Sequence, residues 1–329
     1  MSVKVADGFR CHCSKCIDFH SHFLHRQVFD ECHPWGISSC FGRSLLSPQL
    51  PSFQPMFHPE LQIKDMDERG IDINVLTSCD VLQSRTWTNP DNELRMNSLV
   101  NEECMRWVQA HPRRFIGTAV LPLGNMRKAL DELNWARSAG LRIVQLPSNY
   151  RGHYLGSKRF IDLWAEIHEY RMIAFIHPDG VTDTWFQDYA LWNSIGQSIE
   201  EVKVMSSLIY EGVLDRFPGL KIVMAHGGGY MPHYMGRLDR NVTDKPYTTK
   251  NITKMPSEYL SDFYYDSCVY DARTLEILIE RVGIDRVLMG GDYPVAAVDP
   301  IDFLTTVRIP REEQAKIAGG NADRLLELS

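Results

Sequence analysis

Short apolar segments that end at a polar residue and a backbone breaker recur along this chain, and they constrain its fold more than any other feature. They are rich in β-branched and aliphatic residues, which is typical of strands buried on both faces. Segments with helical spacing separate most of them, at 91–110, 125–139, 158–170, 197–216 and 272–283. The predicted strands span 16–20, 73–78, 115–121, 142–146, 173–177, 221–226, 263–268 and 286–291. This alternation predicts parallel strands joined by crossover helices in an α/β, (β/α)8 TIM barrel.

Length and composition favour a single barrel domain. The chain has 329 residues, of which 44% are hydrophobic and 23% charged, and barrels of this kind reach that size as one unit. We predict a leader over residues 1–15, one domain over 16–329 and a closing helix near 311–327. Residues 23–60 are broken by prolines, glycines and serines, which predicts an inserted loop or small subdomain over the barrel mouth.

Charge and hydropathy exclude several classes of partner. The net charge is −7 and no long basic run occurs, which argues against nucleic acid, and no apolar run has the length of a bilayer span. Residues 1–7 lack the apolar core of a secretion signal, so we expect a cytoplasmic protein. Cys11, Cys13 and Cys16 precede the first strand and are expected as reduced thiols, with a second metal site that includes His12 as the alternative.

Histidine and aspartate residues stand at the ends of the predicted strands. Because side chains alternate in a strand, His20 and His22 point the same way. His177 and Asp292 end later strands, and the carboxyl ends of barrel strands meet where active sites are built. A buried histidine often just satisfies a backbone carbonyl, but this combination of nitrogen and oxygen donors favours a divalent cation such as zinc.

His226 precedes three glycines at the end of another strand. It is either a further metal ligand or, as we prefer, the acid or base that moves protons, since imidazole titrates in the useful range. Four ligands leave an open position on the metal for a water, and the cation lowers the pKa of that water. Asp292 is predicted both as a metal ligand and as a catalytic residue. The strand at 142–146 ends without a lysine or glutamate that could bridge two metals, which favours a single metal.

The long connection over residues 236–260 is rich in basic side chains. It is interpreted either as a solvated loop or as a source of cations for an acidic small-molecule substrate. The basic residues are Arg237, Arg240, Lys245, Lys250 and Lys254.

The motifs around these residues resemble the amidohydrolase superfamily, in particular the branch of aminocarboxymuconate semialdehyde decarboxylase. They extend from the first predicted strand to the last predicted helix. The matching motifs are Ile17-Asp18-Phe19-His20-Ser21-His22-Phe23, Asp65-Met66-Asp67-Glu68-Arg69-Gly70, Pro112-Arg113-Arg114-Phe115, His177-Pro178, Phe217-Pro218-Gly219-Leu220-Lys221 through Ala225-His226-Gly227-Gly228-Gly229, Gly291-Asp292-Tyr293-Pro294 and Gly320-Asn321-Ala322.

This resemblance implies a barrel with one zinc, or manganese in some relatives, held by His20, His22, His177 and Asp292, and with His226 as acid and base. It implies nonoxidative removal of carbon dioxide from a muconate semialdehyde or hydroxybenzoate by a homodimer that needs no organic cofactor.

The resemblance also implies two arginines on the substrate carboxylates, one of them lent by the neighbouring subunit. Lys245 occupies the lent position, and Arg43 is the nearest candidate for the other. Arg237 is a third candidate contact for an acidic substrate. Lysine replaces the planar guanidinium group of arginine with a compact ammonium group. The substrate is therefore expected to differ from that of the decarboxylase.

Other functions use the same set of residues. A metal hydroxide also serves hydrolysis of a C–C or amide bond, or hydration of a related acid. A barrel kept only for binding predicts a broken metal set, whereas all five key positions are filled here.

Overall fold

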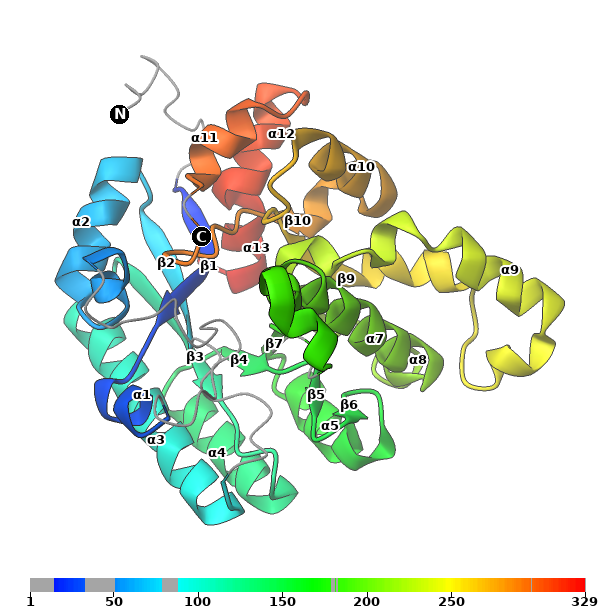
Figure 1. The fold of residues 1–329 in the computed structure, drawn as a ribbon, viewed down its shortest axis with the longest axis horizontal. Helices are drawn as coiled ribbons and strands as arrows, with labels where there is room; N and C mark the ends of the chain where they lie inside the picture. Colours follow the sequence, from blue (N-terminus) through cyan, green and yellow to red (C-terminus); the bar gives the residue numbers. More distant parts are fainter. Residues whose placement is uncertain are drawn as a thin grey trace.

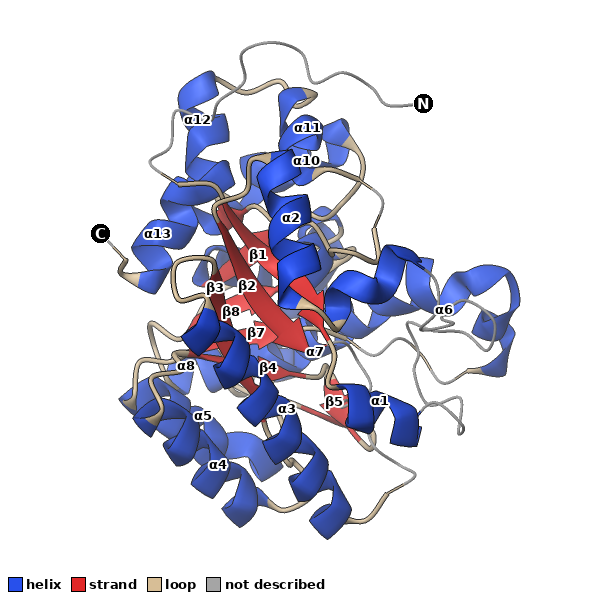
Figure 2. Ribbon diagram, turned by 90° about the vertical axis from the view of Figure 1, so that its left-hand side faces the viewer, coloured by secondary structure: helices blue, strands red, loops and turns tan. Residues whose placement is uncertain are grey.

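Eight parallel strands form a barrel in this protein. The computed structural model describes residues 15–32, 51–78, 88–178, 181, 183–296 and 298–328. The strands pair in the order β1-β2-β3-β4-β7-β8-β9-β10, and helices surround them (Figures 1 and 2). They are β1 (Ile17–Phe23), β2 (Ile73–Ser78), β3 (Phe115–Val120), β4 (Ile143–Leu146), β7 (Ile173–Ile176), β8 (Lys221–Met224), β9 (Phe263–Asp266) and β10 (Val287–Leu288).

Backbone hydrogen bonds between the first strand and the segment after the last one close the barrel. The Phe19 amide donates to the Met289 carbonyl at 2.8 Å, and the His22 amide donates to the Tyr293 carbonyl at 2.7 Å. The predicted strands are therefore confirmed. Three of them end two or three residues earlier than expected, at Met224, Asp266 and Leu288.

Helices connect the strands at all the positions that the periodicity predicts. The main helices are α1 (Arg26–Cys32), α2 (Pro59–Arg69), α3 (Pro90–Ala110), α4 (Met126–Ser138), α5 (Ile161–Glu169), α6 (Leu191–Ser194), α7 (Gly196–Tyr210), α8 (Val213–Arg216), α9 (Gly236–Asp244), α10 (Ala272–Val282), α11 (Pro300–Thr305), α12 (Arg311–Ala315) and α13 (Asn321–Leu326). Among the described residues, no helix combines the length and apolar character that a bilayer span requires.

Short helical turns complete the connections. They are η2 (Pro51–Met56), η4 (Lys158–Phe160), η5 (Thr184–Ala190), η6 (Ala225–Gly228), η7 (Met231–His233), η8 (Pro246–Thr249), η9 (Pro256–Asp262) and η10 (Ile284–Arg286), with a π-helical turn η11 (Lys316–Gly320) between α12 and α13. The predicted closing helix is thus present but interrupted. The single helix predicted over 197–216 divides into α7 and α8, because Gly212 adopts a left-handed φ of 77° between them.

Several elements escaped prediction. Helix α2 was missed because its surroundings are rich in proline, yet Pro59 occupies the first helical position, where proline favours a helix start. The antiparallel pair β5 (Asn149–Tyr150) and β6 (His153–Tyr154) is too short to give a periodic signal. In the expected insertion, α1 and η2 are present, and residues 33–50 lie outside the described residues, so the subdomain stays a prediction.

Two apolar layers support the barrel. Side chains inside it form one cluster, and burying each contributes about 1.5–3 kcal/mol; a second, larger cluster lies between the strands and the helices. The inner cluster includes Ile17, Phe19, Val75, Ile143, Ile173, Phe175, Val223 and Leu288. The barrel is therefore a packed core, and a site is available only at its ends.

A β-bulge in β1 decides where its histidines point. Asp18 pairs with Asn74 of β2, whereas Ser21 pairs with Leu76, so β1 holds one extra residue between the two pairings. Phe19 belongs to the inner cluster, and the ring of His20 also lies 5.2 Å from Phe175 of that cluster. Two consecutive residues thus face the interior, which regular alternation would not allow.

The Asp18 side chain supports this bulge. Its Oδ1 accepts the amide of His20 at 2.9 Å and the amide of Gly291 at 2.9 Å. Such local bonds offer the backbone an alternative to regular strand pairing. Asp18 thereby ties the strand that carries His20 to the segment that carries Asp292.

Candidate metal centre

Four histidines converge at the carboxyl ends of the strands. His20 and His22 come from β1, His177 directly follows β7, and His226 lies in η6 after β8. Their ring centroids are 4.9–5.3 Å apart in the contacting pairs. His20, His22 and His177 are at most 1% exposed. Residues from three distant parts of the sequence therefore form one cluster.

Asp292 completes this cluster. Its Oδ1 lies 2.9 Å from Nε2 of His22 and 3.4 Å from Nε2 of His20. Single side-chain atoms of His20, His177, His226 and Asp292 all lie within 4.8 Å of one another. The predicted metal ligands and His226 thus lie within one site.

Hydrogen bonds to Nδ1, on the side of each ring away from the cluster, orient the paired histidines of β1. Nδ1 of His20 lies 2.7 Å from Oδ2 of Asp266, and Nδ1 of His22 lies 3.1 Å from Oγ1 of Thr77. Because a carboxylate only accepts, His20 carries its proton on Nδ1 and leaves the Nε2 lone pair toward the cluster. This arrangement is typical of metal-binding histidines. Asp266 and Thr77 were not predicted from the sequence.

Burial favours the neutral form of His20 and His177, whereas hydrogen bonding and nearby histidines favour the charged form of Asp292. Burial lowers the pKa of His20, and burial together with the neighbouring imidazoles holds the pKa of His177 well below its usual range. Burial alone would raise the pKa of Asp292, but the His22 hydrogen bond and the surrounding histidines outweigh it and lower that pKa. Neutral nitrogen donors around an anionic oxygen donor fit a divalent cation.

Glu201 on α7 is a partner of His226 that the sequence analysis missed. Its Oε1 lies 2.6 Å from Nδ1 of His226, and the side chain is fully buried. Burial raises the pKa of Glu201 to about 7. Burial acts in the opposite direction on His226, but the Glu201 carboxylate outweighs it and raises the pKa of His226 to about 9. Glu201 therefore favours the protonated form of His226.

A signal for Glu201 was present in the sequence. It lies four residues before the buried Met205 on the apolar face of α7, where a lone charged residue would be costly. Gly229 also points to it, since a Cβ there would lie 2.6 Å from Oε2 of Glu201. The triple glycine thus permits the close approach of α7 to η6.

The neighbouring Glu200 anchors α7 to the loop after β4. Its Oε2 accepts from Ser148 and Asn149 at 2.8 Å each, and its Oε1 accepts from Tyr154 and Lys203 at 2.9 Å each. These bonds connect the helix that carries Glu201 to the β5–β6 hairpin. They restrict the position of α7 relative to the cluster.

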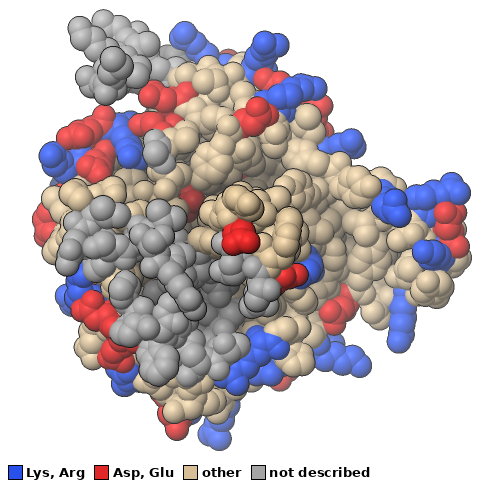
Figure 3. All heavy atoms as spheres, in the orientation of Figure 1, with Lys and Arg blue, Asp and Glu red and all other residues tan. Residues whose placement is uncertain are grey.

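Two of the three predicted substrate contacts lie away from the cluster (Figure 1). Arg237 and Lys245 are exposed on an arm formed by α9 and η8 that extends from the barrel (Figure 1). Lys245 Nζ donates to Asn241 Oδ1 at 3.4 Å. Basic and acidic side chains both occur near the tip of this arm (Figure 3). Arg43 lies outside the described residues, as do Cys11 and Cys13, whereas the side chain of Cys16 is buried.

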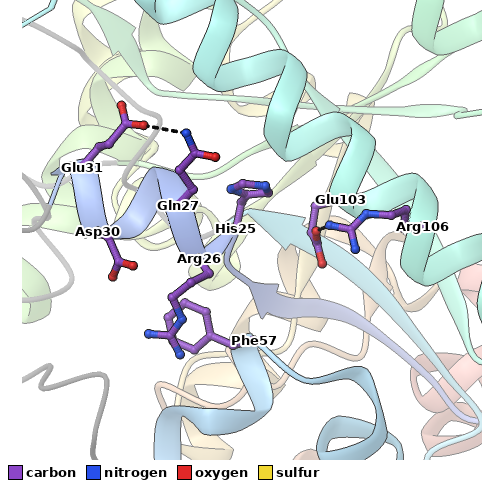
Figure 4. Close-up of a pocket in the computed structure, with 8 residues that line it drawn as sticks. All are labelled: His25, Arg26, Gln27, Asp30, Glu31, Phe57, Glu103 and Arg106. Atoms are coloured by element: carbon purple, nitrogen blue, oxygen red, sulfur yellow. Dashed lines mark hydrogen bonds and ion pairs between the residues drawn. The ribbon is translucent and has the colours of Figure 1, made fainter.

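A separate cavity of about 600 Å³ lies beside α1 (Figure 4). It is lined by His25, Arg26, Gln27, Asp30, Glu31, Phe57, Glu103 and Arg106, and it shares none of them with the metal cluster. His25 is half-buried and its Nδ1 accepts the Val28 amide at 3.3 Å. This histidine therefore supports the start of α1 and is not part of the cluster.

Fold and site together define a TIM-barrel protein with a histidine–aspartate centre of the metal-binding type. The chain belongs to the amidohydrolase family, whose sequence model matches residues 17–328.

Individual relatives are decarboxylases. The chain is 28% identical over 276 residues to a 2-amino-3-carboxymuconate-6-semialdehyde decarboxylase of Dictyostelium discoideum, covering 82% of this chain and 77% of the relative. It is 29% identical over 235 residues to a 6-methylsalicylic acid decarboxylase of Penicillium expansum, covering 68% and 72%.

Solved structures share the barrel fold. The 5-carboxyvanillate decarboxylase of Sphingomonas paucimobilis superposes with a TM-score of 0.84 at 23% identity, covering 95% of this chain and 99% of that one. A dihydroxybenzoic acid decarboxylase of Polaromonas sp., solved with manganese and 2-nitroresorcinol, has a TM-score of 0.81 at 20% identity, covering 95% and 97%.

Proposed function

We propose that this protein is a metal-dependent nonoxidative decarboxylase of an unsaturated or aromatic carboxylic acid. The observation that carries the proposal is the buried centre of His20, His22, His177 and Asp292 with the His226–Glu201 pair beside it. Similarity to decarboxylases of a muconate semialdehyde and of 6-methylsalicylic acid supports the choice of reaction.

His20, His22, His177 and Asp292 would hold one divalent cation. Zinc suits this donor set, and manganese, which the Polaromonas relative contains, is the alternative. When bound, the cation acts as a Lewis acid that draws electron density from oxygens of the substrate. The lowered pKa values of His20, His177 and Asp292 favour the protonation states that metal binding requires.

His226 is the proton donor in this proposal. Glu201 holds its Nδ1, so the opposite ring nitrogen, Nε2, is left to face the reacting carbon. A proton passes from Nε2 to the carbon that carries the carboxylate, forming a C–H bond. The C–C bond then breaks and carbon dioxide leaves. The electron pair of the broken C–C bond returns to the ring or diene. Atoms and charge balance without an oxidant, a reductant or an organic cofactor.

The α9–η8 arm is the proposed source of positive charge for the substrate. Helix α9 has no fully buried residue within this chain, and Lys245 at its end is exposed. In a homodimer the arm of one copy would bring Lys245 to the site of the other, while Arg237 and Arg43 remain further candidates. A cytoplasmic location likewise stays a prediction.

The test is a screen of hydroxybenzoic and muconic acids with protein loaded with zinc or manganese, following carbon dioxide release. We expect release from at least one acid, its loss after chelation and its return when metal is restored. His226→Asn should abolish it, whereas His168→Asn, a control on the exposed side of α5, should not. Hydration or hydrolysis products without carbon dioxide would contradict the proposal.

A further inference from the structure

Three residues at the metal cluster have a strained backbone conformation. Eight non-glycine residues of the described chain have positive φ, and three of them surround this site: His226 at 49°, Asp292 at 51° and Tyr270 at 55°. Bulky L-residues rarely adopt this conformation, and such strain persists only where the surroundings impose it. The roles of His226 and Asp292 account for two of these residues. Tyr270 has no role so far.

Anchors on both sides impose the strain at Tyr270. Oδ1 of Asp266 accepts the Cys268 amide at 3.1 Å, and the hydroxyl of Ser267 accepts the Gly290 amide at 3.2 Å. On the other side, Asp271 caps α10 by accepting the Thr274 amide at 2.7 Å. The loop between β9 and α10 is therefore held at both ends.

The Tyr270 side chain is oriented against its usual preference. A tyrosine normally packs its ring and leaves its hydroxyl near water. Here the residue is 51% exposed, while its hydroxyl donates to Oδ2 of Asp292 at 3.3 Å and accepts from Sγ of the buried Cys268 at 3.0 Å.

We propose that Tyr270 is a positioning residue that selects which oxygen of Asp292 binds the metal. Carboxylates bind cations through one oxygen or both. By engaging Oδ2, Tyr270 leaves Oδ1, the oxygen beside His22 and His20, for the cation. This inference rests on the metal centre of the proposed function and extends it to a residue outside the ligand set.

The size of the effect follows from the geometry. At 3.3 Å the contact is long for a hydrogen bond between a hydroxyl and a carboxylate. Loss of a partner that orients a metal ligand typically costs about 10-fold to 100-fold in metal affinity. For Tyr270 we expect the lower end of that range.

The experiment is a metal titration of chelator-stripped Tyr270→Phe with Mn²⁺ and Zn²⁺, independent of any substrate. The dissociation constant should rise about tenfold, while the melting temperature of the metal-free protein stays at that of the unaltered chain. Tyr270→Gly accepts the positive φ without strain and should bind metal no better than Tyr270→Phe.

Tyr265→Phe is the matched control. In the unaltered chain the Tyr265 hydroxyl donates to the Leu260 carbonyl at 2.8 Å, away from the metal ligands. Loss of this hydroxyl should lower the melting temperature and leave metal affinity unchanged. An unchanged dissociation constant in Tyr270→Phe would refute the positioning role alone. Absence of metal binding by the unaltered protein would refute the proposed function and, with it, this inference.

Discussion

The imidazole of His226 and the carboxylate of Glu201 form a buried 2.6 Å hydrogen bond between the end of β8 and helix α7. Oε2 of Glu201 has no partner in the part of the chain that the structure describes. A buried carboxylate with one unsatisfied oxygen is costly to stability. Its value therefore lies in holding His226 toward the metal cluster.

Replacing Glu201 with glutamine tests this role. Glu201→Gln keeps the size of the side chain but replaces a charge-assisted hydrogen bond with a neutral one, which is roughly half as strong. We expect turnover to fall at least about tenfold, a part of what general acid–base catalysis contributes, while the melting temperature does not fall. Glu201→Gln combined with His226→Asn should be no worse than His226→Asn alone, because the pair acts as a unit. Additive losses would contradict the pairing.

His226→Asn separates a ligand from a proton donor. If His226 is the proton donor, the variant should lose about 100-fold to 10,000-fold in turnover. It should still retain one metal per chain in elemental mass spectrometry. His22→Asn is the matched comparison and should lose the metal. If His226→Asn also loses the metal, His226 is a ligand, as the nearness of its ring to the cluster allows.

Lys245 tests the role of the α9–η8 arm. A hydrogen bond to a charged group contributes about 1.5–3 kcal/mol, so Lys245→Ala should raise KM for an acidic substrate about tenfold or more. Lys250→Ala, exposed on the same arm, should leave KM unchanged. Mixing Lys245→Ala with His226→Asn protein should restore activity if one copy lends its lysine to the other. Unchanged kinetics of Lys245→Ala would remove this residue from the site.

The C-terminal segment predicts a pH dependence of stability. Glu327 accepts from Arg142 at 2.7 Å and from Lys221 at 2.9 Å, and these cations lower its pKa from 4.5 to about 2. A lowered pKa in the folded state means a stabilising contribution that is complete above 4.5 and lost as the pH falls toward about 2. Because Glu327 is exposed, the contribution of these two ion pairs to stability is small.

Thermal unfolding of Glu327→Gln across that pH range provides the measurement. Its melting temperature should lie below that of the unaltered chain at neutral pH, and the difference should vanish at the acid end. Glu68→Gln, which loses a single exposed pair with Lys64 at 3.8 Å, should change less. A difference that persists at acid pH would contradict the assignment to Glu327.

Local patterns in the sequence were sufficient for the barrel and for the histidines and the aspartate that meet at its mouth. Apolar runs with helical segments between them predicted the eight strands that form the barrel. Barrel geometry then places the residues that end those strands together, as it does for His177 and Asp292. These features could be predicted because each depends on a short stretch of chain and on one general rule of packing.

Only the tertiary structure decided how that site is built. The bulge at Asp18 turns His20 toward the interior beside Phe19, through pairing with β2 more than fifty residues away. Glu201, Asp266 and Tyr270 reach the cluster from other elements, and their hydrogen bonds leave no periodic trace in the sequence. The identity of the candidate ligands is thus local information. Their orientation and protonation arise from burial and from contacts that exist only when the chain has folded.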